Sequence, residues 1–211
     1  MSIYLQLHPV SPQRRFIRQA VDCLRDGGVI VYPTDSCYAL GCRIADKAAL
    51  ERIRAIRDID RHHHFTLVCR DLADVGRYAL VDNWQYRLLR AHTPGPYTFL
   101  LKASRETPRR LKHERRGTIG LRVPDHPVPQ LLLTELGEPM MSSTLLLPGE
   151  ELPQTDAKEI YERLQHSVDL VLDGGNCGLV PTSVIDLSGD SAVVVRVGRG
   201  DVAPFAGAAP V

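Results

Sequence analysis

The sequence lacks the features that would place it outside a reducing cytoplasm. Its five cysteines are odd in number and include no Cys-x-x-Cys pair, so we expect neither a disulfide framework nor a zinc site. It has no apolar run long enough to span a bilayer. Its first nine residues show neither the basic start nor the apolar stretch of a signal peptide. These absences predict a cytoplasmic protein with free thiols and no membrane partner.

Several familiar catalytic signatures are absent as well. There is no G-x-x-x-x-G-K-[ST] phosphate loop, no G-x-G-x-x-G turn and no G-x-S-x-G nucleophile elbow. Three adjacent histidines stand at 62–64, but no H-E-x-x-H or comparable ligand set accompanies them, so no metal site is predicted. Cys37 and Cys42 have no adjacent histidine or lysine to activate a thiolate, and both are interpreted as packing residues.

What is present is the composition and periodicity of one α/β domain. The 211 residues are 44% hydrophobic and 24% charged, which suits one sizeable core and is short for two full domains. Helical spacing predicts helices capped by Ser11, Asp46, Asp125 and Asp156, and a further helix over 83–90. Short apolar runs predict strands at 29–32, 65–69, 97–101, 118–123, 139–144, 169–172, 183–187 and 192–197.

This alternation of strands and helices predicts a single layered domain over 11–200. Residues 1–10 are then an N-terminal extension, and 201–211 form a C-terminal tail. The tail is rich in alanine and proline from residue 203 onward, so it is expected to be poorly ordered.

The net charge is only +1, but the charge is unevenly distributed. Residues 51–122 hold 16 Lys or Arg against 8 Asp or Glu, a local excess of +8 that suits a polyanion. An exposed, solvated loop explains the densest basic run equally well, and no aromatic residue interleaves it to stack single-stranded bases. If the run binds RNA through phosphates, the contacting residues are Arg105, Arg109, Arg110, Lys112, Arg115 and Arg116.

Six segments place small hydroxyl residues or an arginine near expected strand ends, and five of them also contain glycine or proline. Hydroxyls and turn amides at such places bind phosphate oxygens or a small zwitterion. Arg122 and Arg196 can add bidentate contacts to phosphate or carboxylate. Such residues also punctuate ordinary turns, but six segments in one chain indicate a nucleotide-sized site. They are Y-P-T-D-S-C-Y-A-L-G-C from Tyr32, T-P-G-P-Y-T from Thr93, T-I-G-L-R-V-P from Thr118, M-S-S-T from Met141, P-T-S from Pro181 and R-V-G from Arg196.

In their order and spacing these motifs resemble the YrdC/YciO family, from about residue 28 to residue 200. The resemblance is closest to the YciO branch, through Y-P-T-D-S-x-Y-A-L-G-C, F-T-L-x-C-R-D-L and T-P-G-x-Y-T-F. It implies an open twisted α/β sheet with flanking helices and a basic concave face. It also implies the joining of threonine, bicarbonate and ATP into threonylcarbamoyl-AMP with release of pyrophosphate, for modification of a tRNA adenosine. An association with double-stranded RNA or tRNA is implied as well.

Carried over by position, the resemblance implies that Thr34, Arg57 and Arg122 are catalytic. ATP would be a substrate accompanied by magnesium, with no tightly bound cofactor and no resident metal. The site would act by positioning and electrostatics, with arginine and magnesium offsetting charge at the α-phosphate. The residues implied in binding nucleotide or substrate are Tyr32, His64, Thr98, Ser142, Thr144, Ser183 and Arg196.

The chain departs from the pattern of active synthases at two places. Their K-x-R pair aligns with Arg57 and Ile59, and their S-x-N aligns with Thr144 and Leu146. Neither Ile59 nor Leu146 can donate to phosphate or adenine. The loss of two such contacts is worth about 3–6 kcal/mol if both were fully used.

Three interpretations therefore stay open. The first is a synthase with weak activity, or a relative that acts on the derived adenylate, in which Arg61 or His64 replaces the missing cation. The second is a double-stranded RNA or tRNA-binding protein on the same fold with little or no synthase activity, whose affinity falls steeply with salt. The third is a small-molecule sensor that binds the ligand without turnover.

Overall fold

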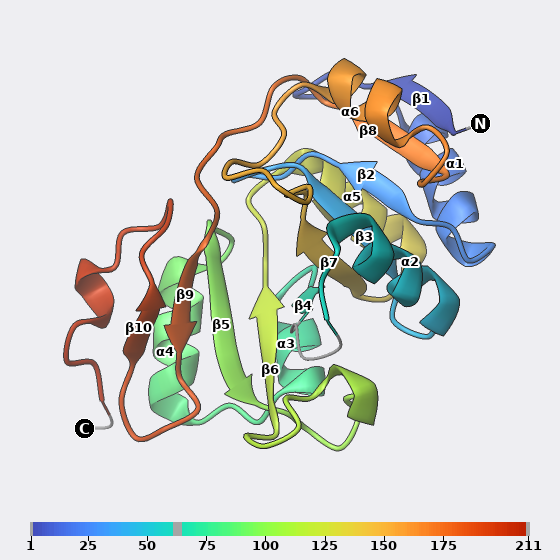
Figure 1. Cartoon of the computed structure of the whole chain (residues 1–211). Helices are drawn as coiled ribbons and strands as arrows, with labels where there is room; N and C mark the ends of the chain where they lie inside the picture. The colour runs from blue at the N-terminus through green and yellow to red at the C-terminus, as the bar shows by residue number, and fades with distance from the viewer. Residues whose placement is uncertain (1, 61–64, 210–211) are drawn as a thin grey trace.

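Ten strands form one twisted sheet in the computed structural model, which describes residues 2–60 and 65–209 (Figure 1). The strand order is β1-β8-β2-β3-β7-β4-β6-β5-β9-β10, with parallel and antiparallel neighbours mixed. The strands are β1 (Ile3–Gln6), β2 (Ile30–Tyr32), β3 (Ala39–Arg43), β4 (Thr66–Val68), β5 (Tyr97–Lys102), β6 (Thr118–Arg122), β7 (Met140–Thr144), β8 (Leu170–Asp173), β9 (Ser183–Asp186) and β10 (Val193–Arg196). The predicted α/β class with an open twisted sheet is confirmed.

Helices flank this sheet, as predicted. They are α1 (Arg14–Arg25), α2 (Lys47–Arg57), α3 (Leu72–Tyr78), α4 (Asn83–His92), α5 (Pro127–Leu136) and α6 (Ala157–Leu164), with short 3-10 turns η1 (Arg109–Leu111) and η2 (Ala203–Phe205). Over the β1-β8-β2-β3 part of the sheet, α1 and α5 pack together on one face, and α2 and α6 cover the other (Figure 1).

Strand β2 shows why these helices occupy both faces. The side chains of Ile30 and Tyr32 join the apolar cluster of α1 and α5, whereas Val31 joins the larger cluster on the opposite face. All three side chains are fully buried. Successive side chains of a strand point to opposite faces, so a strand covered on both sides is a continuous apolar run. This explains the apolar run at 29–32 that predicts the strand.

Side-chain caps set the starts of several helices. Asp46 and Asp156 cap α2 and α6 as predicted. Asp46 accepts from one backbone N–H of the first turn, and Asp156 accepts from two. The predicted start of α1 after Ser11 is wrong, because the helix begins at Arg14. His8 Nδ1 accepts from the backbone N–H of Ser11 at 3.1 Å, and this contact holds 8–11 in a turn of its own.

The segment before residue 11, expected as an extension, contributes the edge strand β1. It pairs in parallel with β8, in the register Ile3↔Leu170 to Gln6↔Asp173. Neither β1 nor α3 is predicted from the sequence, and both are short. Strand β3 is also not predicted, since Gly41 weakens the pattern of a strand. A Cβ at Gly41 would lie 2.8 Å from the Tyr32 ring, so this position requires the close approach that glycine allows.

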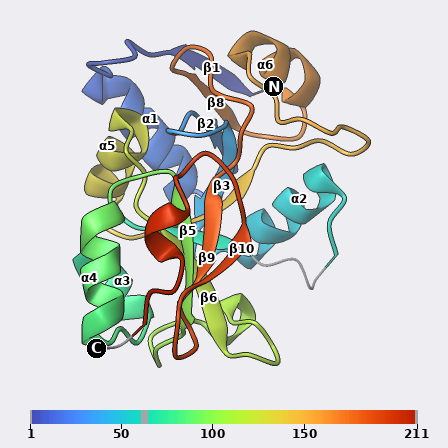
Figure 2. The ribbon, with the colours of Figure 1, turned by 90° about the vertical axis from the view of Figure 1, so that its left-hand side faces the viewer.

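The expectation of a poorly ordered tail is wrong for 203–205. This segment forms η2, and the Phe205 side chain is fully buried. Its ring lies against His92 of α4 and against Tyr97 and Phe99 of β5, with centroid distances of 4.6, 5.5 and 6.0 Å. Figure 2 shows η2 between α4 and the strands. A single aromatic residue thus anchors a segment whose composition resembles a free end.

The N-cap of α5 is His126, not Asp125 as predicted. The backbone N–H of Asp125 donates to Asp35 Oδ2 at 3.0 Å, which keeps this residue outside the helix. His126 Nδ1 instead accepts from the backbone N–H of Val128 at 3.2 Å. Burial lowers the pKa of His126 below its ordinary value of 6.5. Asp35 and Asp125 oppose this shift, and Arg122 adds to it.

We expect His126 to make the free energy of unfolding depend on pH. Because its pKa is lower in the folded protein than in the unfolded chain, the unfolded chain binds more protons below pH 6.5. The stabilisation is therefore present above pH 6.5 and is lost as the pH falls through the folded pKa. His126→Asn should keep the cap and remove this part of the pH dependence, as measured by urea unfolding at pH 7.5 and 5.5. Identical pH dependence in both proteins would contradict the prediction.

Candidate functional site

A cleft of about 310 Å³ lies over the middle of the sheet, where β7, β4, β6, β5 and β9 are neighbours. The strand register places Thr66 beside Ser142 and Val68 beside Arg122, on the face of the sheet that forms the floor of the cleft. The charged residues of the described lining are three arginines and one glutamate, so the cleft is basic. The polar side chains of this lining are Arg57, Arg122, Arg196, Glu151, Thr66, Thr98, Ser142, Ser143, Thr144 and Thr182.

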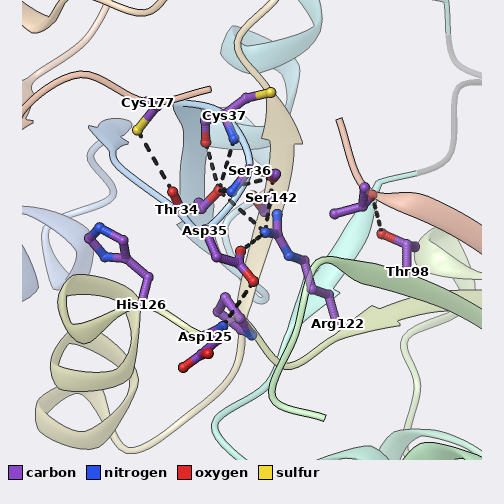
Figure 3. Close-up of polar contacts among 12 residues, drawn as sticks. Thr34, Asp35, Ser36, Cys37, Thr98, Arg122, Asp125, His126, Ser142 and Cys177 are labelled. Carbon is purple, nitrogen blue, oxygen red and sulfur yellow. Dashed lines mark hydrogen bonds and ion pairs between the residues drawn. The ribbon is translucent and has the colours of Figure 1, made fainter. Parts of the chain in front are cut away.

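Arg122 is the most deeply placed cation of the cleft. Its Nη2 donates to Asp35 Oδ1, to Ser36 Oγ at 3.0 Å and to Thr34 Oγ1 at 3.3 Å (Figure 3). The side chains of Arg122 and Asp35 are only 8% and 9% exposed. Arg122 Nε is also buried and has no hydrogen-bond partner among the described residues. The arginine is therefore held firmly by one nitrogen, and its guanidinium brings a positive charge to the cleft lining, which suits an oxyanion.

Thr34 shapes the turn that carries Asp35. Its Oγ1 accepts from the backbone N–H groups of Ser36 and Cys37 at 3.1 and 3.2 Å and donates to the Cys37 carbonyl at 2.7 Å (Figure 3). With Arg122 also donating to it, this hydroxyl is fully engaged within the protein. Thr34 is adjacent to the cleft but is not among the residues that line it. Its observed contacts are those of a residue that positions Asp35 and Arg122.

Arg57 and Arg196 enter the cleft from opposite sides. Arg57, at the end of α2, donates through Nε to the Leu146 carbonyl at 3.3 Å and through Nη1 to Ser143 Oγ at 2.5 Å. Arg196, in β10, donates through Nε and Nη2 to the Thr182 carbonyl at 3.1 and 2.8 Å. Burial lowers the pKa of both side chains. Both cations have lost part of their hydration, so an anion in the cleft would be favoured beside them.

The hydroxyl residues of the cleft are tied together in pairs. Ser142 Oγ lies 2.7 Å from the Tyr32 hydroxyl, and Thr98 Oγ1 lies 2.9 Å from Thr182 Oγ1. Thr144 also lines the cleft, and its binding of nucleotide or substrate stays a prediction. Tyr32 does not line it, because its side chain is fully buried beneath Ser142. Burial also raises the pKa of Tyr32 to about 12, so its hydroxyl stays protonated.

Ser183 lies on the other side of its strand from the cleft. Its side chain is fully buried, donating to the Gly200 carbonyl at 2.6 Å and accepting from the backbone N–H of Gly198 at 2.9 Å. The neighbouring residue Thr182 lines the cleft instead. Asp35, which holds Arg122, is not among the site residues named from the sequence. Nor are four polar residues of the lining, Thr66, Ser143, Glu151 and Thr182.

The two departures from the synthase pattern have different structural consequences. Asp58 ends α2 in a left-handed conformation with φ of 50°, and Ile59 then packs against the hydrophobic core. Leu146, in contrast, lines the cleft itself. An aliphatic side chain thus faces the ligand space where active synthases carry an amide. Arg61 and His64, suggested as replacement cations, lie outside the described residues.

The basic run from Arg105 to Arg116 lies in the connection between β5 and β6, outside the cleft lining of the described residues. Three side chains of the run are engaged in contacts within the protein. Arg110 donates to the Ile44 carbonyl, Lys112 donates to the Ser104 carbonyl at 2.7 Å, and Arg116 lies 3.6 Å from Asp186. The side chains that remain exposed without such a contact are Arg105, Arg109 and Arg115. RNA binding by this run stays a prediction.

Among the described residues, no group of three or more His, Cys, Asp or Glu side chains is arranged to hold a metal ion. In the same part of the chain, no helix combines the length and apolarity that a membrane crossing requires.

Comparisons with known proteins agree with this architecture. A family model named Sua5/yciO/yrdC and described as "Telomere recombination" matches residues 22–198. The Escherichia coli protein YciO, described as uncharacterized, is 56% identical over 97% of this chain and 100% of its own. The crystal structure of E. coli YciO has a TM-score of 0.93 over the same shares of the two chains.

More distant relatives carry functional names. A threonylcarbamoyl-AMP synthase of Chromobacterium violaceum is 36% identical over 70% of this chain and 76% of its own. The structure of P. abyssi Sua5 complexed with L-threonine has a TM-score of 0.85 at 24% identity, covering 93% of this chain and 58% of that one. This last likeness concerns the fold alone. Together the matches show that the chain belongs to the Sua5/YciO/YrdC family.

Proposed function

We propose that the cleft binds ATP with threonine and bicarbonate and forms threonylcarbamoyl-AMP, with turnover lower than that of synthases that keep the amide at the place of Leu146. The observation that carries this proposal is the meeting of three arginines with paired hydroxyls in one cleft. Arg57, Arg122 and Arg196 come from parts of the chain far apart in sequence and point into the same space. The named activity of the Chromobacterium relative supports the choice of reaction.

The chemistry required is mostly positioning and neutralisation of charge. Threonine, bicarbonate and the ATP phosphates are all anionic or carry a carboxylate, and arginine recognises such groups through charge-assisted hydrogen bonds. The guanidinium of Arg122, whose side chain is only 8% exposed, and the partly desolvated Arg57 and Arg196 are suited to this task. Held side by side, the reactants gain the advantage of proximity. Glu151 is the one carboxylate among the described lining residues, so magnesium would enter as the complex of ATP.

We expect pyrophosphate release from ATP that requires both threonine and bicarbonate. Arg57→Ala should reduce this release at least about tenfold, because one charge-assisted hydrogen bond is worth about 1.5–3 kcal/mol. The measurement is a coupled pyrophosphate assay in which each substrate is omitted in turn. Arg90→Ala is the matched control, since Arg90 is an exposed arginine of α4 outside the cleft. Release that survives in Arg57→Ala, or that is absent from the unaltered protein, would overturn the proposal.

A further inference from the structure

Two loops border the cleft and bring apolar side chains to its mouth. The loop at 145–156 follows β7 and contributes Leu146 and Leu152, and the loop at 174–182 follows β8 and contributes Leu179. Leu152 is 57% exposed and Leu179 is 46% exposed, so both present apolar surface to solvent. We call Leu146, Leu152 and Leu179 the leucine rim. An exposed apolar group at the edge of a ligand cleft is stabilised when a ligand covers it.

The leucine rim adjoins the cations of the cleft. The Nε of Arg57 donates to the Leu146 carbonyl, so the first residue of the rim is fixed beside this arginine. The cleft therefore offers arginines and hydroxyls to an anionic group and leucines to a flat or apolar group next to it. A nucleotide combines these two chemistries in one molecule. With its phosphates at the arginines, the nucleobase is the part that remains to contact the rim.

The side chains of the rim have no donor or acceptor with which to read the hydrogen-bonding edge of a base. The backbone N–H of Leu146 donates to the Thr144 carbonyl at 3.0 Å, and its carbonyl already accepts from Arg57. Pro153 and Pro181, which line the cleft beside the leucines, have no N–H to donate. The carboxylate of Glu151 only accepts hydrogen bonds. Because this residue is exposed, water competes with a base for it. A base here gains apolar contact while its polar edge remains hydrated.

We infer that the leucine rim leaves the cleft without a preference between bases. Adenine and guanine nucleotides should therefore bind with nearly equal affinity. This inference rests on the proposed function only in that a nucleotide occupies the cleft. Leu146 is its central residue, because it lines the cleft and its carbonyl is fixed next to Arg57. Bases are told apart mainly by hydrogen bonds to their edges, and leucine side chains provide none.

The test is calorimetric binding of the α,β-methylene analogues of ATP and GTP, which cannot release pyrophosphate, at one fixed magnesium concentration. The unaltered protein should bind the two analogues within about threefold of each other. Leu146→Asn should create a preference of at least about fivefold for one of them, because an amide can pair with a base edge. Leu152→Ala should weaken both analogues equally, by about threefold to tenfold, through the loss of apolar contact.

Leu80→Ala is the control, because Leu80 is 59% exposed and lies outside the cleft. It should bind both analogues as the unaltered protein does. A preference above about threefold for either analogue in the unaltered protein, or unchanged binding in Leu152→Ala, would overturn the inference and leave the proposed function standing. Failure of both analogues to bind at all would overturn the proposed function together with the inference.

Discussion

Replacement of Asp35 by alanine is expected to lower the free energy of unfolding by about 3–5 kcal/mol, the usual cost of breaking a buried ion pair. The change removes the carboxylate that faces Arg122, while the guanidinium stays in a site where its side chain is only 8% exposed. Ser36 and Thr34 would still accept from Nη2, but neither hydroxyl carries a compensating charge. The backbone N–H of Asp125 would lose its acceptor as well.

Urea unfolding at pH 7.5 measures this effect, and Glu135→Ala is the matched control. Glu135 pairs with Arg18 at 3.2 Å, but the two side chains are 36% and 62% exposed. An exposed pair of this kind contributes about 0–1 kcal/mol. A second variant that changes both buried partners, Asp35→Ala with Arg122→Met, should recover part of the loss, because it no longer leaves an unpaired charge. If Asp35→Ala costs no more than Glu135→Ala, the assignment of Arg122 to a buried ion pair is wrong.

The importance of Asp35 could not be predicted from the sequence, although its neighbours could. The Y-P-T-D motif predicts Thr34 as a residue of the site, and the T-I-G-L-R-V-P motif predicts Arg122. Asp35 and Arg122 are separated by 87 positions, and only the pairing of distant strands brings them together. A motif shows which residues occur together, but it does not show which of them faces the ligand and which one orients its neighbour.

The same limit appears at Ser183. The P-T-S motif predicts hydroxyls at a strand end, and the structure contains them there. However, side chains alternate between the two faces of a strand, so a difference of one position reverses the face. Thr182 faces the cleft, and Ser183 binds the turn at 198–200. Most long elements were predictable because their period is clear, whereas β1, β3 and α3 are short and their pairing depends on distant strands.

The turn bound by Ser183 gives the second large expected effect, at Gly198 of the R-V-G motif. A Cβ at this position would lie 2.4 Å from the Pro181 carbonyl oxygen and 2.5 Å from the Thr182 carbonyl oxygen. These are backbone atoms, so no side-chain rotation can relieve the overlap. We expect Gly198→Ala to lower the free energy of unfolding by about 3 kcal/mol, at the upper end of the usual cost of overpacking.

Gly189→Ala provides the matched control in the same hairpin, because a Cβ there would meet no atom within 4 Å. Urea unfolding should show it unchanged or stabilised by about 0.4–1 kcal/mol, as expected where alanine fits the native backbone. Gly198→Ala should also weaken binding of the ATP analogue, since the displaced Thr182 carbonyl is the acceptor that holds Arg196 in the cleft. Equal stability of the two variants would mean that β10 can move away from 181–182 freely. The R-V-G glycine would then have no packing role, and the position of Arg196 would not depend on this close backbone approach.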